Sequence, residues 1–129
     1  MKQLKFIGLY TETNSISEEV TVAGIENTKE LQDLHEKVML QLKQYFKYDV
    51  KPDMLLSKES SESTLLWIKN YPKKSAFKNF FPHITLGYGR FENYSFEEEF
   101  EISGLAICHL SNHCTCCKIL SYIEIKKKQ

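Results

Sequence analysis

The chain lacks three features that would place it at once in a large class of proteins. It has no excess charge of either sign, because 17 basic residues balance 17 acidic ones over 129 residues. Binding to long duplex DNA needs a basic surface, so neutrality argues against duplex DNA as a partner. A local pocket for a nucleotide or a short RNA stays open. No apolar run approaches the ~20 residues that span a bilayer, so we expect no membrane contact.

The sequence also lacks a secretion signal and widely spaced cysteines. Its start, MKQLKFIGLY, has no long apolar segment and no cleavage site of small residues. All four cysteines fall between positions 108 and 117, whereas a secreted scaffold spreads its cysteines to join distant loops. We therefore expect a cytoplasmic protein with reduced thiols.

Length and local patterns predict a single α+β domain over residues 1–129. Apolar residues at three- and four-residue spacing predict one long helix over 27–46, with Asn27 and Glu30 at its N-terminus. β-favouring runs predict a mainly antiparallel sheet on which this helix packs, and Pro82 fixes the start of one strand. The strands are expected at 4–12, 20–25, 64–70, 83–89, 101–110 and 116–125, with exposed or irregular loops at 57–63, 71–79 and 91–100.

The segment FFPHITLGYGR, residues 80–90, contains the clearest chemical pattern. His83 and Thr85 are two apart in a predicted strand, so they project from the same side. An imidazole can give or take a proton near neutral pH, and a neighbouring hydroxyl can donate a hydrogen bond to a phosphate oxygen. The pair would form half of a metal-free phosphodiester site. The alternative is an ordinary structural histidine in a strand.

FFPHITLGYG resembles the second motif of the 2H phosphoesterases, which include 2′-5′ RNA ligase-like proteins and 2′,3′-cyclic nucleotide phosphodiesterases. The resemblance implies a bilobal α+β fold with two H-x-[ST] motifs facing each other across a cleft. One histidine would act as base and the other as acid, with two hydroxyls on the phosphate and no metal or cofactor. By element order, residues 4–25, 27–46 and 100–125 resemble the part of the family that follows its first motif.

The chain departs from this family because residues 1–82 hold only one histidine, His35. It is followed by Glu36 and Lys37 on the predicted helix, where it would flank the apolar stripe. Three explanations stay open: the chain is the C-terminal portion of a longer enzyme, it binds without cleaving, or residues 108–117 supply the second histidine. A missing N-terminal lobe or a second copy of the chain is therefore a candidate partner.

The segment CHLSNHCTCC, residues 108–117, contains two further H-x-[ST] tripeptides, which begin at His109 and His113. His113 lies at the predicted turn and is the better candidate for contacting a ligand. The cysteines and histidines of this segment also suggest a zinc-binding module. Since all these ligands lie on one hairpin, we favour reduced thiols that pack as small hydrophobic groups and expect no metal.

Residues beside the motif could complete a nucleotide site. Tyr88 offers an aromatic platform for a base and Arg90 a cation for a phosphate. The site expected from the sequence thus has His83 and Thr85 as catalytic residues, and Tyr88, Arg90 and His113 as substrate-binding residues. The expected substrate is a 2′,3′-cyclic phosphate, a 2′-5′ linkage or a cyclic oligonucleotide.

Overall fold

The computed structural model describes residues 3–14 and 16–125. The predicted α+β class with antiparallel strand pairing is confirmed, but two helices are present where one was expected. The elements are β1 (Gln3–Thr13), β2 (Glu19–Ile25), α1 (Lys29–Leu42), α2 (Glu62–Lys74), β3 (His83–Tyr88), β4 (Glu98–Glu101), β5 (Gly104–Leu110) and β6 (Cys116–Glu124). Short 3₁₀ turns lie at Lys43–Tyr45, Pro52–Met54, Phe77–Asn79 and Asn112–Cys114.

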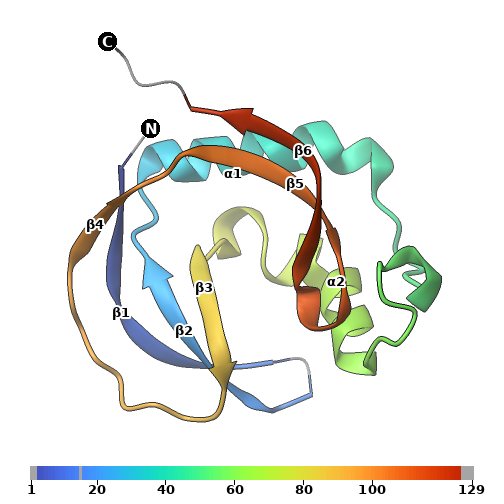
Figure 1. The fold of residues 1–129 in the computed structure, drawn as a ribbon, viewed down its shortest axis with the longest axis horizontal. Coiled ribbons are helices and arrows are strands. Elements are labelled where there is room, and N and C mark those ends of the chain that lie inside the picture. Colours follow the sequence, from blue (N-terminus) through green and yellow to red (C-terminus); the bar gives the residue numbers. More distant parts are fainter. Residues whose placement is uncertain (1–2, 15, 126–129) are drawn as a thin grey trace.

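The strands form a curled antiparallel sheet and a separate hairpin. The sheet has the order β3-β2-β1-β4, and β5 pairs with β6 alone. In Figure 1 the sheet occupies the left half of the molecule, and the β5–β6 hairpin arches over the top to the right, where its turn lies close to α2. The strands predicted at 4–12 and 20–25 pair as the β1–β2 hairpin, and those predicted at 101–110 and 116–125 pair as the β5–β6 hairpin.

The β1–β2 hairpin supplies much of the core. Its connecting loop is held by Asn14, whose side-chain oxygen accepts hydrogen bonds from the backbone N–H groups of Ile16 and Glu18. Strand β2 is covered on both sides by the neighbouring strands β1 and β3, and its residues from Val22 to Ile25 are buried. The second half of β2 is thus shielded from water, which suits its β-favouring apolar residues, whereas Glu19 at its start is exposed.

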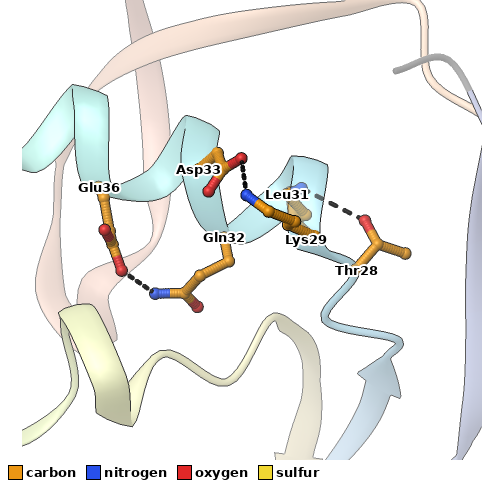
Figure 2. Close-up of polar contacts among 6 residues, drawn as sticks. All are labelled: Thr28, Lys29, Leu31, Gln32, Asp33 and Glu36. Atoms are coloured by element: carbon orange, nitrogen blue, oxygen red, sulfur yellow. Dashed lines mark hydrogen bonds and ion pairs between the residues drawn. The ribbon is translucent and has the colours of Figure 1, made fainter.

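Helix α1 lies within the predicted range but begins after a different cap. The cap expected at Asn27 is wrong: Thr28 is the N-cap, and its hydroxyl accepts the N–H of Leu31 at 3.3 Å (Figure 2). The side chain of Asn27 instead donates to Gln32 and to the carbonyl of Phe80. A threonine hydroxyl satisfies one of the free N–H groups of the first turn, as an asparagine side chain would, although asparagine is the more favoured cap.

Two side-chain pairs lie along α1, the first exposed and the second partly buried. Lys29 contacts Asp33 at 2.7 Å, and Gln32 donates to Glu36 at 2.7 Å (Figure 2). Residues four apart are neighbours on a helix surface, so both pairs support the helical conformation locally.

The strand predicted at 64–70 is wrong, because these residues belong to α2. The hydroxyl of Ser61 accepts the N–H of Thr64 at 3.2 Å and caps the helix. Glu62 in the first turn and two lysines in the last turn complement the helix dipole. A short apolar run fits a buried strand and a helix equally well, and here the cap within the polar segment 57–63 decides for a helix.

The acidic segment 91–100 is not irregular throughout, since Glu98–Glu101 forms β4 against β1. Phe100 stacks on Phe6 with ring centroids 4.4 Å apart, while Phe96 lies 6.1 Å from Phe6. The aromatic rings hold this edge strand in place although its glutamates face water.

Within the described ranges, no helix is long and apolar enough to cross a membrane.

The buried core is small for a chain of this length. The buried hydrophobic residues are Val22, Ala23, Ile25, Met39, Leu55 and Ala76. These residues lie on β2, on α1 and in the connections that surround α2.

Candidate functional site

A cavity of about 650 Å³ lies against one face of β2 and β3. Helix α2 and the 3₁₀ turn Asn112–Cys114 complete its wall. Four of the five residues expected from the sequence line this cavity: His83, Thr85, Tyr88 and His113. Positions far apart in the sequence therefore meet in one place.

A β-bulge brings Tyr88 to the same face as His83 and Thr85. Tyr88 follows His83 by five positions, so in a regular strand its side chain would point to the opposite face. The register with β2 shifts between Thr85 and Gly87, which leaves Leu86 as the extra residue. Directly paired residues share a face, and the partners of His83, Thr85 and Tyr88 are Gly24, Val22 and Val20, which alternate along β2.

The backbone fixes which nitrogen of His83 carries a proton in the neutral ring. Nδ1 of His83 lies 2.7 Å from the carbonyl oxygen of Phe81. A carbonyl can only accept a hydrogen bond, so Nδ1–H is the donor. The lone pair of the neutral imidazole is then on Nε2, the nitrogen that a general base would use. The Phe81 ring stacks on the imidazole with centroids 5.4 Å apart.

Gly24 makes room for the aromatic groups beside His83. It pairs with His83 across β2 and β3. A Cβ at this position would lie 2.9 Å from the Tyr10 ring and 3.2 Å from the Phe81 ring. Tyr10 and Phe81 meet edge to face at 6.3 Å. The missing side chain therefore lets two rings pack over the backbone and hold Phe81 against the imidazole.

Asn112 is oriented by three donors. Its Oδ1 accepts hydrogen bonds from the N–H of Ser61, the hydroxyl of Thr64 and the N–H of His113, at 2.9–3.0 Å. Because these groups all donate to the oxygen, the amide nitrogen of Asn112 must face the other way. It lies 3.3 Å from Nε2 of His113. Thr64 itself is buried, and its hydroxyl also accepts from the N–H of His113 at 2.9 Å.

This network determines the proton arrangement of the pair formed by His113 and Tyr88. Since the Asn112 amide donates to Nε2 of His113, the proton of the neutral imidazole is on Nδ1. Nδ1 lies 2.6 Å from the Tyr88 hydroxyl oxygen and donates to it. The hydroxyl proton of Tyr88 is then free for a ligand in the cavity.

Neither H-x-[ST] tripeptide of the hairpin brings both of its members to the cavity. Nε2 of His109 lies 3.1 Å from the carbonyl of Met54, and His109 lines a different cavity of about 590 Å³. Thr115 donates its hydroxyl to the carbonyl of Asn112 at 2.7 Å and does not line the cavity with His83. His113 therefore reaches the site without the hydroxyl of its own tripeptide.

Arg90 lies apart from the other expected site residues. Its Nε is 3.8 Å from a carboxylate oxygen of Glu19, and it is not among the residues that line the cavity. A role for Arg90 in binding stays a prediction from the sequence.

His35 has a structural environment. Its Nε2 accepts the N–H of Phe77 at 3.0 Å, and its ring stacks on Phe80 at 3.8 Å. Burial lowers the pKa of His35, which favours the neutral ring that this hydrogen bond needs. His35 thereby holds the segment that leads into β3.

Several cavity residues were not expected from the sequence as parts of the site. Ser63 and Thr64 line the cavity from α2. Asn112 is not among the lining residues, but it accepts a hydrogen bond from the Thr64 hydroxyl. The sequence signal that could have placed Ser63 and Thr64 correctly is the N-terminal cap at Ser61, because such a cap indicates a helix rather than a strand. Trp67 and Tyr71 also line the cavity.

The cysteines of the hairpin are free thiols. Burial raises the pKa of the Cys114 and Cys116 thiols, and the neighbouring Cys108 raises the pKa of Cys116 further. In residues 3–14 and 16–125, no three His, Cys, Asp or Glu side chains gather closely enough to hold a metal ion.

No protein-family model, curated protein or solved structure matches this chain.

Proposed function

We propose that the chain is a metal-independent phosphodiesterase that acts on 2′,3′-cyclic phosphates or on 2′-5′-linked or cyclic oligonucleotides. The observation that carries the proposal is that His83, Thr85 and the free hydroxyl proton of Tyr88 face one cavity. The resemblance of FFPHITLGYG to the second motif of the 2H phosphoesterases supports the same chemistry.

Each group has a defined task in the hydrolysis of a 2′,3′-cyclic phosphate. Nε2 of His83 takes a proton from a water molecule, whose oxygen forms a bond with phosphorus. The hydroxyl of Thr85 donates to a phosphate oxygen as negative charge develops on it. The bond from phosphorus to one ribose oxygen breaks, and that oxygen receives the proton of Tyr88. The hydrogen bond from His113 remains on the tyrosine oxygen that has given up its proton.

The rest of the cavity wall suits a nucleoside. Trp67, Tyr71, Phe80 and Phe81 all line it. A base that stacks on an aromatic ring gains about 1–3 kcal/mol without sequence preference. This arrangement favours a nucleotide or a short single strand, which a neutral protein can bind in a local pocket.

A specific observation also favours a second candidate, a nucleotide-binding module that does not cleave. Among the residues that the structure describes, only one complete H-x-[ST] tripeptide faces the cavity. Tyr88 and His113 would have to supply the acid that the second tripeptide provides in a two-motif site. Without that acid, the cavity would still bind nucleotides through its aromatic wall.

The test is the turnover of 2′,3′-cyclic nucleotides in the presence of a chelator. We expect His83→Ala to lower kcat by about 10²–10⁴-fold, the usual contribution of a general acid or base. His109→Ala is the matched control, because His109 also begins an H-x-[ST] tripeptide but lies in the other cavity; it should keep turnover within about twofold. Undiminished activity of His83→Ala would contradict the proposal. Calorimetric binding of nucleotides without any turnover would favour the second candidate.

A further inference from the structure

The residues that line the cavity with His83 carry very little charge. Among the described residues that line it, none is a lysine or an arginine, and Glu12 is the only one with a carboxylate. Arg90 follows Tyr88 closely in the sequence, but it contacts Glu19 and does not line the cavity. Within the described part of the chain, a phosphate in this cavity therefore meets neutral donors and histidines, and no lysine or arginine.

The sheet register places Glu12 on the same side as Tyr88. Glu12 pairs with Val20 across β1 and β2, and Val20 pairs with Tyr88 across β2 and β3. Directly paired residues share a face, so the three side chains form one row. Neighbouring strands are about 4.8 Å apart, which puts the backbone of Glu12 about 10 Å from that of Tyr88.

The charge of Glu12 is not offset by an ion pair. In the described ranges, Glu12 takes part in none of the ion pairs, and it is exposed. Like unit charges about 10 Å apart near a protein surface repel strongly enough to change an affinity by about tenfold. A phosphodiester carries one negative charge, whereas a phosphomonoester carries about 1.5 to 2 at neutral pH. Glu12 therefore repels a monoester more than a diester.

We propose that Glu12 is a specificity-determining residue, which favours phosphodiesters and cyclic phosphates in this cavity and excludes phosphomonoesters. An unpaired like charge is a general means of rejecting a wrong ligand. This inference rests on the proposed function, because it takes a phosphate to bind beside His83 and Thr85. Hydrolysis of a cyclic phosphate yields a monoester, so the same repulsion favours release of the product.

Two ligands that differ by one charge on the same phosphate test the proposal: 2′-deoxyadenosine 3′-monophosphate and its methyl phosphodiester. In calorimetry at low salt, the unmodified protein should bind the monoester about 10-fold more weakly than the diester. Glu12→Gln should bind both ligands more tightly and reduce this ratio by at least about threefold, whereas a damaged cavity would weaken both. Glu101→Gln is the matched control, because Glu101 is exposed on β4 and does not line the cavity; it should keep the ratio of the unmodified protein.

Salt provides a second measurement, because the repulsion acts through charge alone. Raising the ionic strength from about 0.01 M to about 0.15 M shortens the Debye length from about 30 Å to about 8 Å. The ratio of the two affinities should narrow in the unmodified protein and change less in Glu12→Gln.

The outcomes separate this inference from the proposed function. Equal binding of the two ligands by the unmodified protein overturns the inference, and turnover of 2′,3′-cyclic nucleotides would still leave the proposed function standing. A preference for the diester without any turnover supports the inference and contradicts the phosphodiesterase. An unchanged ratio in Glu12→Gln, or an equal change in Glu101→Gln, overturns the role of Glu12. No binding of either ligand also overturns the inference, and the turnover assay then decides the proposed function by itself.

Discussion

The hydroxyl of Tyr88 lies 2.6 Å from Nδ1 of His113, although 25 positions separate the two residues. Two local irregularities make this contact: the bulge at Leu86, and the left-handed backbone of His113, whose φ is 58°. Asn112 then fixes the proton on the nitrogen that faces the tyrosine.

Removing the hydroxyl of Tyr88 should slow turnover more than it weakens binding. We expect Tyr88→Phe to lower kcat by about 10–100-fold, somewhat less than a full general acid contributes, since the aromatic surface for the ligand is unchanged. Tyr94→Phe is the matched control because Tyr94 has a similar exposure, 62% against 60%, and does not line the cavity. Steady-state kinetics with 2′,3′-cyclic nucleotides separate kcat from KM. A Tyr88→Phe enzyme with unchanged kcat would remove the tyrosine from the mechanism.

Asn112 accepts hydrogen bonds through its Oδ1 and donates one through its amide nitrogen to Nε2 of His113. Two substitutions separate these two functions. Asn112→Ala removes the acceptor of the Ser61 N–H and of the buried Thr64 hydroxyl and should cost about 1–3 kcal/mol in the free energy of unfolding, because these donors are left unsatisfied. Asn112→Asp keeps an acceptor for Ser61 and Thr64 but presents a carboxylate to Nε2 of His113. The aspartate variant should therefore stay closer to the unmodified protein in stability.

The ring protons of His113 report on the same pair of variants. Nitrogen chemical shifts should show Nδ1–H in the unmodified protein and a protonated Nε2 in Asn112→Asp, because a carboxylate can only accept. The same Nε2 state in both proteins would contradict the orientation of the Asn112 amide.

Adding a methyl group at Gly24 should destabilise the site. Gly24→Ala places a Cβ against the Tyr10 and Phe81 rings, and overpacking of this kind costs about 1–3 kcal/mol. Gly87→Ala on the neighbouring strand is the control, because a Cβ there has no atom within 4 Å; it should change stability by no more than about 0.5 kcal/mol. Urea unfolding measures both. Equal effects of the two substitutions would show that the packing around Gly24 is not tight.

Stability should fall on mild acidification through His35. Burial lowers the pKa of His35 in the folded protein, while in the unfolded chain the pKa is near 6.5. The unfolded state therefore binds more protons below that pH, so this contribution is complete above about pH 6.5 and is lost as the pH falls towards the folded pKa. His35→Gln should show a smaller loss of stability than the unmodified protein between pH 7.5 and 5.5 in urea titrations. If the loss is the same in both proteins, His35 does not cause it.

Much of the strand content could be predicted because the pattern of apolar residues is local information. The hairpin β1–β2, strand β3 with Pro82 at its start, and the hairpin β5–β6 follow from β-favouring runs between turn residues. The apolar run around Trp67 fits a strand or a helix, and only the cap at Ser61 distinguishes them. Strand β4 escaped prediction because the Phe6–Phe100 contact that anchors it joins distant positions.

The sequence by itself determined the α+β class, the antiparallel pairing, and the placing of His83 and Thr85 on one side of a strand, since all three depend on local periodicity. The tertiary structure alone decided that Tyr88 and His113 share that cavity while Arg90 and His109 do not. A bulge changes the face of every later residue in a strand. The orientation of Asn112 depends on donors from α2 that lie about fifty positions away in the sequence, and such long-range contacts leave no periodic signal in the chain.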